Sequence, residues 1–182
     1  MFRFSAREIA RIGLGIALIA ICSWISIPMT VPFTLQTFAV CLVTALLGLK
    51  DGCWAVAGYI LLGALGVPVF SGMRGGPGIL LGTTGGYIVG FLLTAFTVSL
   101  SVRKFGLKLL PLLCAMAVGI LLCYAFGTAW FMLVYARSTG PISLATALGW
   151  CVLPFLLPDA VKITLAALLA RRLQKAVVTV GR

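Results

Sequence analysis

A run of 38 residues without Asp, Glu, Lys or Arg, at positions 12–49, constrains the fold more than any other feature of the sequence. A helix that spans a bilayer needs about 20 apolar residues, so this run has room for two. Pro28 and Pro32 supply a break between them, because proline has no backbone N–H to donate and ends or kinks a helix. The run therefore predicts membrane helices over 7–27 and 35–49.

The composition excludes the soluble classes of protein. Hydrophobic residues make up 62% of the 182-residue chain and charged residues only 9%, whereas roughly a quarter of the residues in a soluble domain are charged. The chain has no His, the commonest general base and a frequent metal ligand, so we expect neither a His-based catalytic site nor a metal site. We expect a single all-α membrane domain over 1–182 that binds or transports a ligand, without a cofactor.

Charged and glycine-rich turns divide the rest of the chain into further apolar segments. The six membrane passages are expected over 7–27, 35–49, 53–66, 84–102, 110–136 and, interrupted by prolines, 142–175. The turn between the second and third helices is expected at 50–52, and a seventh short element within the last passage is an alternative. Between the third and fourth helices, seven Gly and one Pro in the stretch 72–86 exclude a plain helix and predict a long loop or a re-entrant segment.

The positions of Lys and Arg predict an orientation, since these residues favour cytoplasmic loops. With the N-terminus inside, six passages place most of the 14 basic residues on the cytoplasmic side: Arg3, Arg7, Arg11, Lys50, Arg103, Lys104, Lys108, Arg171, Arg172, Lys175 and Arg182. Arg74 and Arg137 fall outside, and Lys162 lies within the last apolar segment. We therefore expect both termini in the cytoplasm and the glycine-rich loop outside, and the net charge of +11 is explained largely by orientation.

Asp159 and Lys162 are ionisable residues within an apolar stretch, which makes them functional candidates. They are three positions apart, so on a helix they share a face. Pro158 fits the first helical position just before them, and the positive end of such a helix favours an anionic or carbonyl-bearing group. The alternatives are a structural Asp–Lys pair that holds the last helix in the bundle and a lysine that extends to the membrane surface.

Two more polar side chains are candidates for ligand contact. Arg74 is a lone cation in the glycine-rich loop, and its guanidinium could hold a carboxylate with two parallel hydrogen bonds. The alternative is an ordinary loop arginine that faces headgroups or water. Gln36 is an amide next to the proline break, and a buried amide needs partners. It either bonds backbone groups opened by the prolines or faces a ligand.

Small residues at a spacing of four mark the first helix, at Ala6 and Ala10 and again at Gly13 and Ala17. Such ridges allow another helix to approach closely. The ridge is either packed within the bundle or is a docking face for a partner subunit.

Four segments, in order along the chain, match a known family. They are Val-Pro-Phe-Thr-Leu-Gln-Thr-Phe at 31–38, Leu-Leu-Gly-Ala-Leu-Gly-Val-Pro-Val-Phe at 61–70, Gly-Thr-Thr-Gly-Gly-Tyr at 82–87, and Pro154-Phe155 with Asp159 and Lys162. The chain resembles the biotin-specific S components of energy-coupling factor (ECF) transporters, the BioY family. The resemblance implies a six-helix subunit of a prokaryotic cell membrane that captures biotin from outside. It also implies partners, a transmembrane T protein and two ATP-binding proteins, and the chain itself has no G-x-x-x-x-G-K-[ST] phosphate loop.

Biotin would suit the candidate residues chemically. Asp159 can accept from the urea N–H groups, Lys162 or Gln36 can donate to the urea carbonyl, and Arg74 can reach the carboxylate of the tail. The apolar middle of the ligand would be walled by Phe33, Phe70, Tyr87 and Trp130.

Glycine hinges could let the outer loop close over the ligand. The expected hinge residues are Gly75, Gly76, Gly85 and Gly86. Three other functions remain open: an S component for a different vitamin, a purely structural membrane subunit, and a lipid-modifying membrane enzyme that uses Asp159 and Lys162 as acid and base. The enzyme is disfavoured because one Asp and one Lys, without His or a metal cluster, are few groups for a catalytic site.

Overall fold

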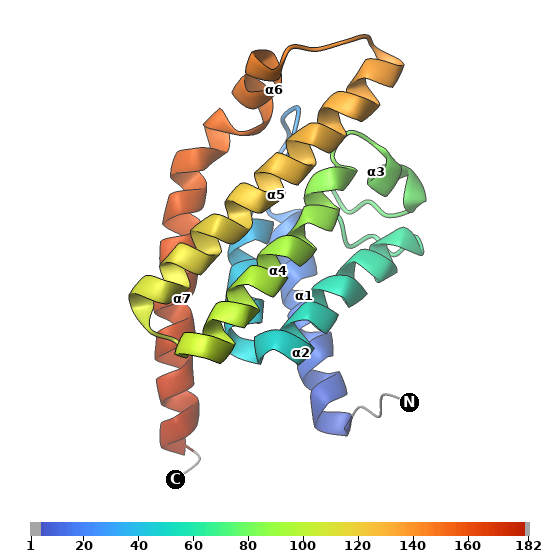
Figure 1. The fold of residues 1–182 in the computed structure, drawn as a ribbon. Helices are drawn as coiled ribbons and strands as arrows, with labels where there is room; N and C mark the ends of the chain where they lie inside the picture. Colours follow the sequence, from blue (N-terminus) through green and yellow to red (C-terminus); the bar gives the residue numbers. More distant parts are fainter. Residues whose placement is uncertain (1–4, 181–182) are drawn as a thin grey trace.

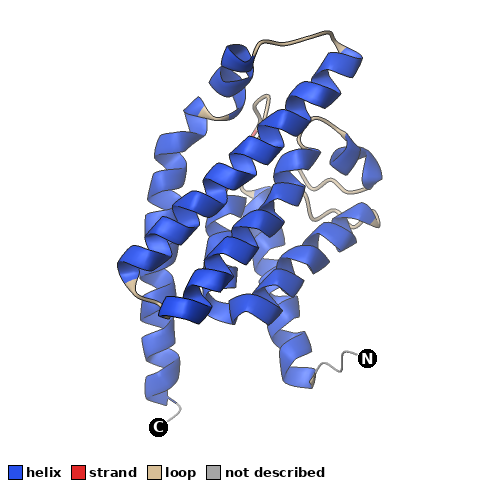
Figure 2. Cartoon of the chain, in the orientation of Figure 1, coloured by secondary structure: helices blue, strands red, loops and turns tan. Residues whose placement is uncertain are grey.

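The chain forms a bundle of helices in the computed structural model, which describes the backbone of residues 5–180 and the side chains of 5–174 (Figures 1 and 2). The helices are α1 Ala6–Trp24, α2 Gln36–Ala64, α3 Pro77–Leu81, α4 Gly85–Phe105, α5 Leu109–Ser138, α6 Leu144–Cys151 and α7 Leu153–Val180. Two short strands, β1 Ser26–Ile27 and β2 Phe33–Thr34, pair antiparallel between α1 and α2. The all-α class is therefore confirmed apart from this small hairpin.

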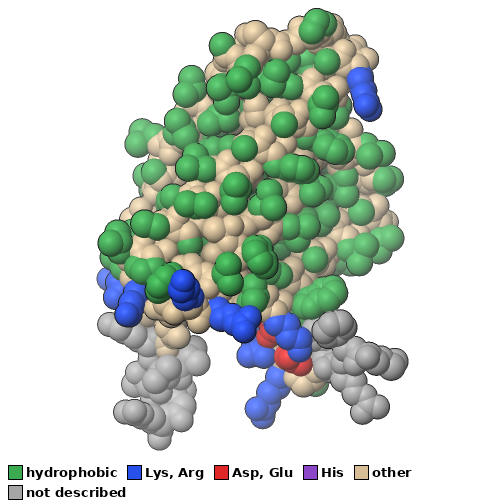
Figure 3. All heavy atoms as spheres, viewed as in Figure 1, with side chains coloured by type: hydrophobic (Ala, Val, Ile, Leu, Met, Phe, Trp, Pro, Cys, Tyr) green, Lys and Arg blue, Asp and Glu red, His purple; other side chains and the backbone are tan. Residues whose placement is uncertain are grey.

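Four helices in the described part of the chain are long and apolar enough to cross a membrane: α2, α4, α5 and α7. Large apolar side chains cover the outside of the bundle (Figure 3), and Leu157, for example, is 78% exposed. Such a surface suits lipid rather than water. The shorter α1 has 19 residues and carries Arg7, Glu8 and Arg11 near its start. The chain is accordingly a multi-pass membrane protein.

Lys and Arg gather at one end of the molecule in Figure 3, and the first turn of α1 and the last turns of α7 lie at that same end (Figure 1). Two ion pairs hold the start of α1 there. Arg11 Nη2 lies 2.9 Å from Asp51 Oδ2, and Lys50 Nζ lies 2.7 Å from Glu8 Oε1. Arg3 and Arg182, which were expected at this end, lie outside the described residues.

The second and third expected helices are the two arms of α2, and the expected break at 50–52 is wrong by a few residues. The chain bends at Gly48, whose φ of 75° and ψ of −167° lie outside the helical region. Glycine adopts positive φ without the steric cost that a Cβ imposes, so the bend falls there. Lys50 and Asp51 are helical residues of the second arm, close to α1.

Other expected boundaries also shift. Helix α1 ends at Trp24 rather than at position 27, because residues 26–27 form β1. Helix α4 continues through Arg103 and Lys104, which were expected in a loop. The glycine-rich stretch contains the one-turn helix α3, and its last two glycines, Gly85 and Gly86, already belong to α4.

The last expected passage is two helices, the short α6 and the long α7. Pro158 lies inside α7, which begins at Leu153, so the expectation that Pro158 opens a helix is wrong. Asp159 is consequently a mid-helix residue, and the helix N-terminus that was expected just before it is absent. Proline removes one intrahelical hydrogen bond, from its own position to the carbonyl of Pro154, but the membrane-facing helix continues on either side of it.

Glycines bring neighbouring helices into close contact at particular points. A Cβ on Gly15 of α1 would lie 2.9 Å from Val43 Cγ1 of α2, and one on Gly119 of α5 would lie 3.0 Å from Thr94 Cα of α4. Thr94 Oγ1 also donates to the backbone oxygen of Gly119, at 2.8 Å. These contacts fix α1 against α2 and α4 against α5, around the cavity described next.

Candidate functional site

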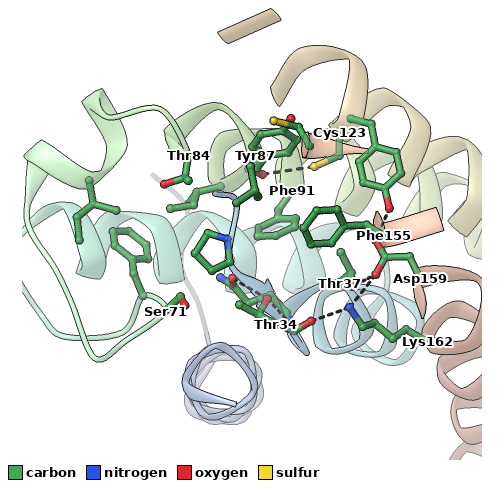
Figure 4. A pocket seen from close by; sticks show the side chains of 18 of the residues that line it. Thr34, Thr37, Ser71, Thr84, Tyr87, Phe91, Cys123, Phe155, Asp159 and Lys162 are labelled. Carbon is green, nitrogen blue, oxygen red and sulfur yellow. Dashed lines mark hydrogen bonds and ion pairs between the residues drawn. The ribbon is translucent and has the colours of Figure 1, made fainter. Parts of the chain in front are cut away.

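A cavity lies among α2, α4, α5 and α7 and is bordered by the hairpin before α2 and the loop after it (Figure 4). Figure 4 shows Ser71 and Thr84 at one end, Asp159 and Lys162 at the other, and aromatic side chains between them. The lining residues are Val31, Pro32, Thr34, Gln36, Thr37, Phe70, Ser71, Arg74, Ile79, Thr84, Tyr87, Ile88, Phe91, Cys123, Tyr124, Cys151, Phe155, Asp159 and Lys162. The cavity is thus mostly apolar, with polar groups concentrated at its ends, as in many small-molecule sites.

Asp159 is the acceptor at the inner end of the cavity. Its side chain is buried, and its Oδ1 accepts from Thr37 Oγ1 at 2.9 Å and from Lys162 Nζ at 2.8 Å. Its Oδ2 accepts a short hydrogen bond from the hydroxyl of Tyr124. A carboxylate has about four lone-pair sites, so it can accept a further donor from a ligand. Three helices, α2, α5 and α7, fix its position.

Lys162 is equally buried and is held from three sides. Its Nζ donates to Asp159 Oδ1 and, at 2.7 Å, to the backbone oxygen of Thr34 in β2, and it lies 4.0 Å from the centre of the Phe33 ring. The expectation that Asp159 and Lys162 share a helix face is confirmed by their ion pair. The carboxylate and the aromatic face partly offset the cost of burying a cation here.

Gln36 begins α2 and extends the polar network away from α7. Its Nε2 donates to Tyr59 OH at 2.6 Å, and its Oε1 accepts from Thr34 Oγ1 at 3.0 Å. The amide is thus satisfied by side chains, not by backbone opened at the prolines, while it also lines the cavity. Thr34 therefore connects the two residues: its hydroxyl bonds to Gln36, and its backbone carbonyl accepts from Lys162.

The loop after α2 forms the opposite, more exposed end. Arg74 and Phe70 exchange two backbone hydrogen bonds, and Arg74 Nε donates to the backbone oxygen of Ser71 at 3.2 Å. Among the described residues, none accepts a hydrogen bond from the outer nitrogens of the guanidinium, and Arg74 borders the cavity. The Phe70 ring is buried directly over Gly63, where a Cβ would overlap it, and packs edge-on against Tyr59 at 5.5 Å.

Of the four expected aromatic walls, Phe70 and Tyr87 line the cavity and the other two do not. Tyr87 is held by Thr128, with 2.9 Å between their hydroxyl oxygens. Phe33 lies behind Lys162 and stacks on Phe155, which takes its place at the wall. The indole of Trp130 donates instead to the backbone oxygen of Gly82, at 3.0 Å, and so supports the loop before α4.

The four expected hinge glycines occupy two different settings. Gly76 has a φ of 104°, and a Cβ on Gly75 would lie 2.4 Å from the backbone oxygen of Val67, so both belong to a tightly folded loop. Gly85 and Gly86 are buried in the first turn of α4 and pack against Leu80 and Trp130 respectively. The loop proper therefore ends before these two residues.

The small-residue ridge of α1 faces outward. Ala6, Ala10, Gly13 and Ala17 are all exposed, and a Cβ on Gly13 would meet nothing within 4 Å. The inward-facing small residue of α1 is Gly15, which the spacing pattern did not single out. The alternative that this ridge packs within the bundle is therefore wrong.

Several site residues were missed by sequence reasoning. Thr34 and Thr37 flank Gln36 in an apolar segment, and their polarity was a usable signal. Tyr124 lies in the middle of a long uncharged stretch of α5, so nothing in the pattern marks it. Phe155 belongs to one of the four segments that match the family, but no contact with a ligand was expected of it. Within residues 5–174, no group of three or more Cys, Asp or Glu side chains is placed to hold a metal ion.

The model of the BioY family matches residues 1–179 of this chain. The chain is 42% identical to the biotin transporter BioY of Thermotoga maritima, over 93% of its own length and 96% of that protein. It is 40% identical to the probable biotin transporter BioY of Pyrococcus horikoshii, over 93% of its own length and 97% of that protein. The crystal structure of the S-component for biotin from an ECF-type ABC transporter matches with a TM-score of 0.83 and 26% identity, over 95% of each chain. On these matches, the chain belongs to the BioY family.

Proposed function

We propose that this chain binds biotin from outside the cell and is the S component of an ECF transporter. The observation that carries the proposal is the buried Asp159–Lys162 pair at one end of an apolar cavity whose other end is bordered by Arg74. Biotin has the matching order of groups: a cyclic urea, an apolar sulfur-containing ring and chain, and a carboxylate. Transport energy would come from separate ATP-binding subunits through a transmembrane T protein.

The urea end of biotin would lie against Asp159. Its N–H groups would donate to the carboxylate, whose position is already fixed by Thr37 and Tyr124. Lys162 or Gln36 would donate to the urea carbonyl. A buried polar group that loses its hydrogen-bond partner costs roughly several kcal/mol. A ligand without the urea, which displaces water from these side chains but cannot bond to them, would therefore be rejected. The aromatic side chains Phe91 and Phe155 would cover the ring.

The carboxylate end would lie beneath the loop that carries Arg74. The free outer nitrogens of its guanidinium suit a carboxylate, which accepts two parallel hydrogen bonds. Since Arg74 is exposed and the loop contains Gly75 and Gly76, movement of this loop would open and close the cavity from outside. Gly85 and Gly86 would serve as the fixed base of that movement, because they are packed within α4.

Six passages with both termini in the cytoplasm of a prokaryotic cell are supported by two features. The start of α1 and the end of α7 lie at the same end of the bundle, as an even number of passages requires. That end also carries most of the basic side chains (Figure 3), which favours the cytoplasmic side. Reporter fusions at each terminus that are active only in the cytoplasm would test the orientation.

The exposed ridge of α1, formed by Ala6, Ala10, Gly13 and Ala17, would be the docking face for the T protein. Small residues permit close contact of helix backbones in a membrane. The ridge is free to do this, since α1 uses another face, with Gly15, to contact α2.

Equilibrium binding of labelled biotin to the purified chain tests the central proposal. Competition with excess unlabelled biotin, thiamine, riboflavin and phospholipid separates the remaining functions. We expect only biotin to compete. Competition by another vitamin at lower concentration would identify an S component of different specificity, and failure of labelled biotin to bind would refute the proposal.

A further inference from the structure

We propose that the seam between α5 and α7 is a binding site for one anionic phospholipid of the leaflet at the basic end of the bundle. Two separate hollows lie along this seam. One is lined by Leu107, Lys108, Arg171 and Gln174, and the other by mostly aliphatic residues further along the same two helices. The first suits a phosphate headgroup and the second suits an acyl chain.

The first hollow is positively charged without a compensating acid. Lys108 and Arg171 form no ion pair with any described residue. The three acids of the chain are all engaged elsewhere, since Glu8 and Asp51 pair with residues near α1 and Asp159 lies in the ligand cavity. Two cations beside a neutral amide at a membrane surface fit an anionic headgroup, and such basic pockets between membrane helices are known lipid sites.

The second hollow is an apolar groove. Its walls include Ala117 and Leu121 of α5 and Ala160 and Ile163 of α7, and its inner end is formed by Tyr124 and Asp159. The small Ala side chains leave the space. Tyr124 and Asp159 also line the ligand cavity, so the groove and the cavity share one wall, the hydrogen bond between these two residues.

The spacing of the two hollows fits one lipid molecule. At about 1.5 Å per residue, the residues that line the groove lie from roughly 12 Å to roughly 24 Å beyond the basic hollow along the two helices. The distance from the headgroup level of a bilayer to its midplane is roughly 20 Å. An acyl chain whose phosphate is held by Lys108 and Arg171 would therefore run along the groove past Ala117 and Ala160 and end close to Leu121.

General attraction of a basic membrane surface to anionic lipid is the alternative, and the chain offers a matched control for it. Arg103 and Lys104 lie in the last turn of α4, at the same end of the bundle, but do not line the hollow. Replacing either pair by glutamine removes the same charge. Only the pair in the hollow would lose a specific site.

Native mass spectrometry of the full-length purified protein provides the test, with dioleoyl phosphatidylglycerol as the probe and dioleoyl phosphatidylcholine as its neutral counterpart. We expect one tightly bound phosphatidylglycerol, and K108Q/R171Q should weaken its binding about 25-fold, from about fivefold per charge. R103Q/K104Q should retain most of the affinity. Equal losses in the two double variants, or equal binding of phosphatidylcholine, would overturn the proposal.

A variant that fills the groove tests the second part of the proposal, that the groove holds an acyl chain. Ala117→Phe should weaken binding of the dioleoyl lipid and leave that of dihexanoyl phosphatidylglycerol, whose chains are too short to reach the groove, unchanged. Equal effects on both lipids, or displacement by inorganic phosphate as effective as by the lipid, would contradict a lipid-shaped site. If K108Q/R171Q loses its helical circular dichroism, the single variants K108Q and R171Q replace it in the same comparison.

Discussion

Lys162 of α7 donates a hydrogen bond of 2.7 Å to the backbone oxygen of Thr34, 128 positions earlier in the chain. The same ammonium is paired with Asp159 at 2.8 Å. The hairpin that joins α1 to α2 is therefore tied to a carboxylate that lines the cavity through a single side chain, that of Lys162.

Lys162→Met should destabilise the protein strongly. The variant leaves Asp159 charged and buried without its cation, which typically costs about 3–5 kcal/mol in free energy of unfolding. The double variant D159N/K162M should regain part of this loss, because it removes the unpaired charge as well. Thermal unfolding of the purified proteins in one detergent would measure both effects, and a double variant as unstable as K162M would contradict the account.

Asp159→Asn should weaken biotin binding by about 1–3 kcal/mol, the cost of an unmet buried partner. The amide of Asn places donor hydrogens opposite the urea N–H groups and beside the donors of Thr37 and Tyr124. Equilibrium binding of labelled biotin to purified protein measures the loss. Asp51→Asn is the matched control, since Asp51 is also buried and ion-paired but lies near α1, at the basic end of the bundle. Unchanged affinity of D159N would remove Asp159 from the site.

The sequence predicts the polar ends of the site better than its walls. Asp159, Lys162 and Arg74 are conspicuous because charges are scarce in an apolar chain, and all three line the cavity. Aromatic residues are common in such a chain, so choosing among them requires knowledge of the packing. Of the four expected walls, Phe70 and Tyr87 line the cavity, and Phe33 and Trp130 are not among its lining residues. Tyr124 borders the cavity through a tertiary contact, its hydrogen bond to Asp159, that no local pattern records.

The fold shows the same division. The apolar segments could be predicted because bilayer thickness fixes their length. Their boundaries depend on single residues in context. Gly48 bends α2, although the turn was expected at 50–52, and Pro158 lies inside α7 although it was expected to begin a helix. Membrane helices tolerate proline because neighbouring groups satisfy the freed carbonyl, which is a tertiary effect.

Arg74→Ala should weaken the binding of biotin more than that of biotin amide, which lacks the charge of the tail. The guanidinium borders the cavity, and no described residue accepts from its outer nitrogens, which suit a carboxylate. A charged hydrogen bond of this kind contributes about 1.5–3 kcal/mol. The two affinities are measured by competition against labelled biotin. Equal losses for both ligands would assign Arg74 a structural role in the loop.

Gly86→Ala should lower the melting temperature, because its Cβ would lie 2.3 Å from Trp130 Cβ, in a buried helix contact. Overpacking of this kind costs about 1–3 kcal/mol. Gly78→Ala is the control, since a Cβ there meets nothing within 4 Å. Thermal unfolding of both variants against the parent chain gives the comparison. A G86A protein as stable as the parent would mean that Trp130 moves aside freely.

Ala10→Leu should abolish biotin uptake by cells while leaving biotin binding to the purified chain intact. Ala10 is exposed on the ridge of α1, away from the cavity, so a larger side chain there would block a closely packed partner helix without disturbing the bundle. Ala125→Leu, at an exposed position of α5, controls for bulk added to the membrane-facing surface.

Uptake of labelled biotin is measured in cells that also produce the T protein and the ATP-binding subunits, and binding is measured on protein purified from the same cells. A125L should support uptake at the level of the parent chain. If A10L transported normally, the ridge would not be the docking face. If it lost binding as well as uptake, Ala10 would act through the structure of the bundle, in conflict with its outward position.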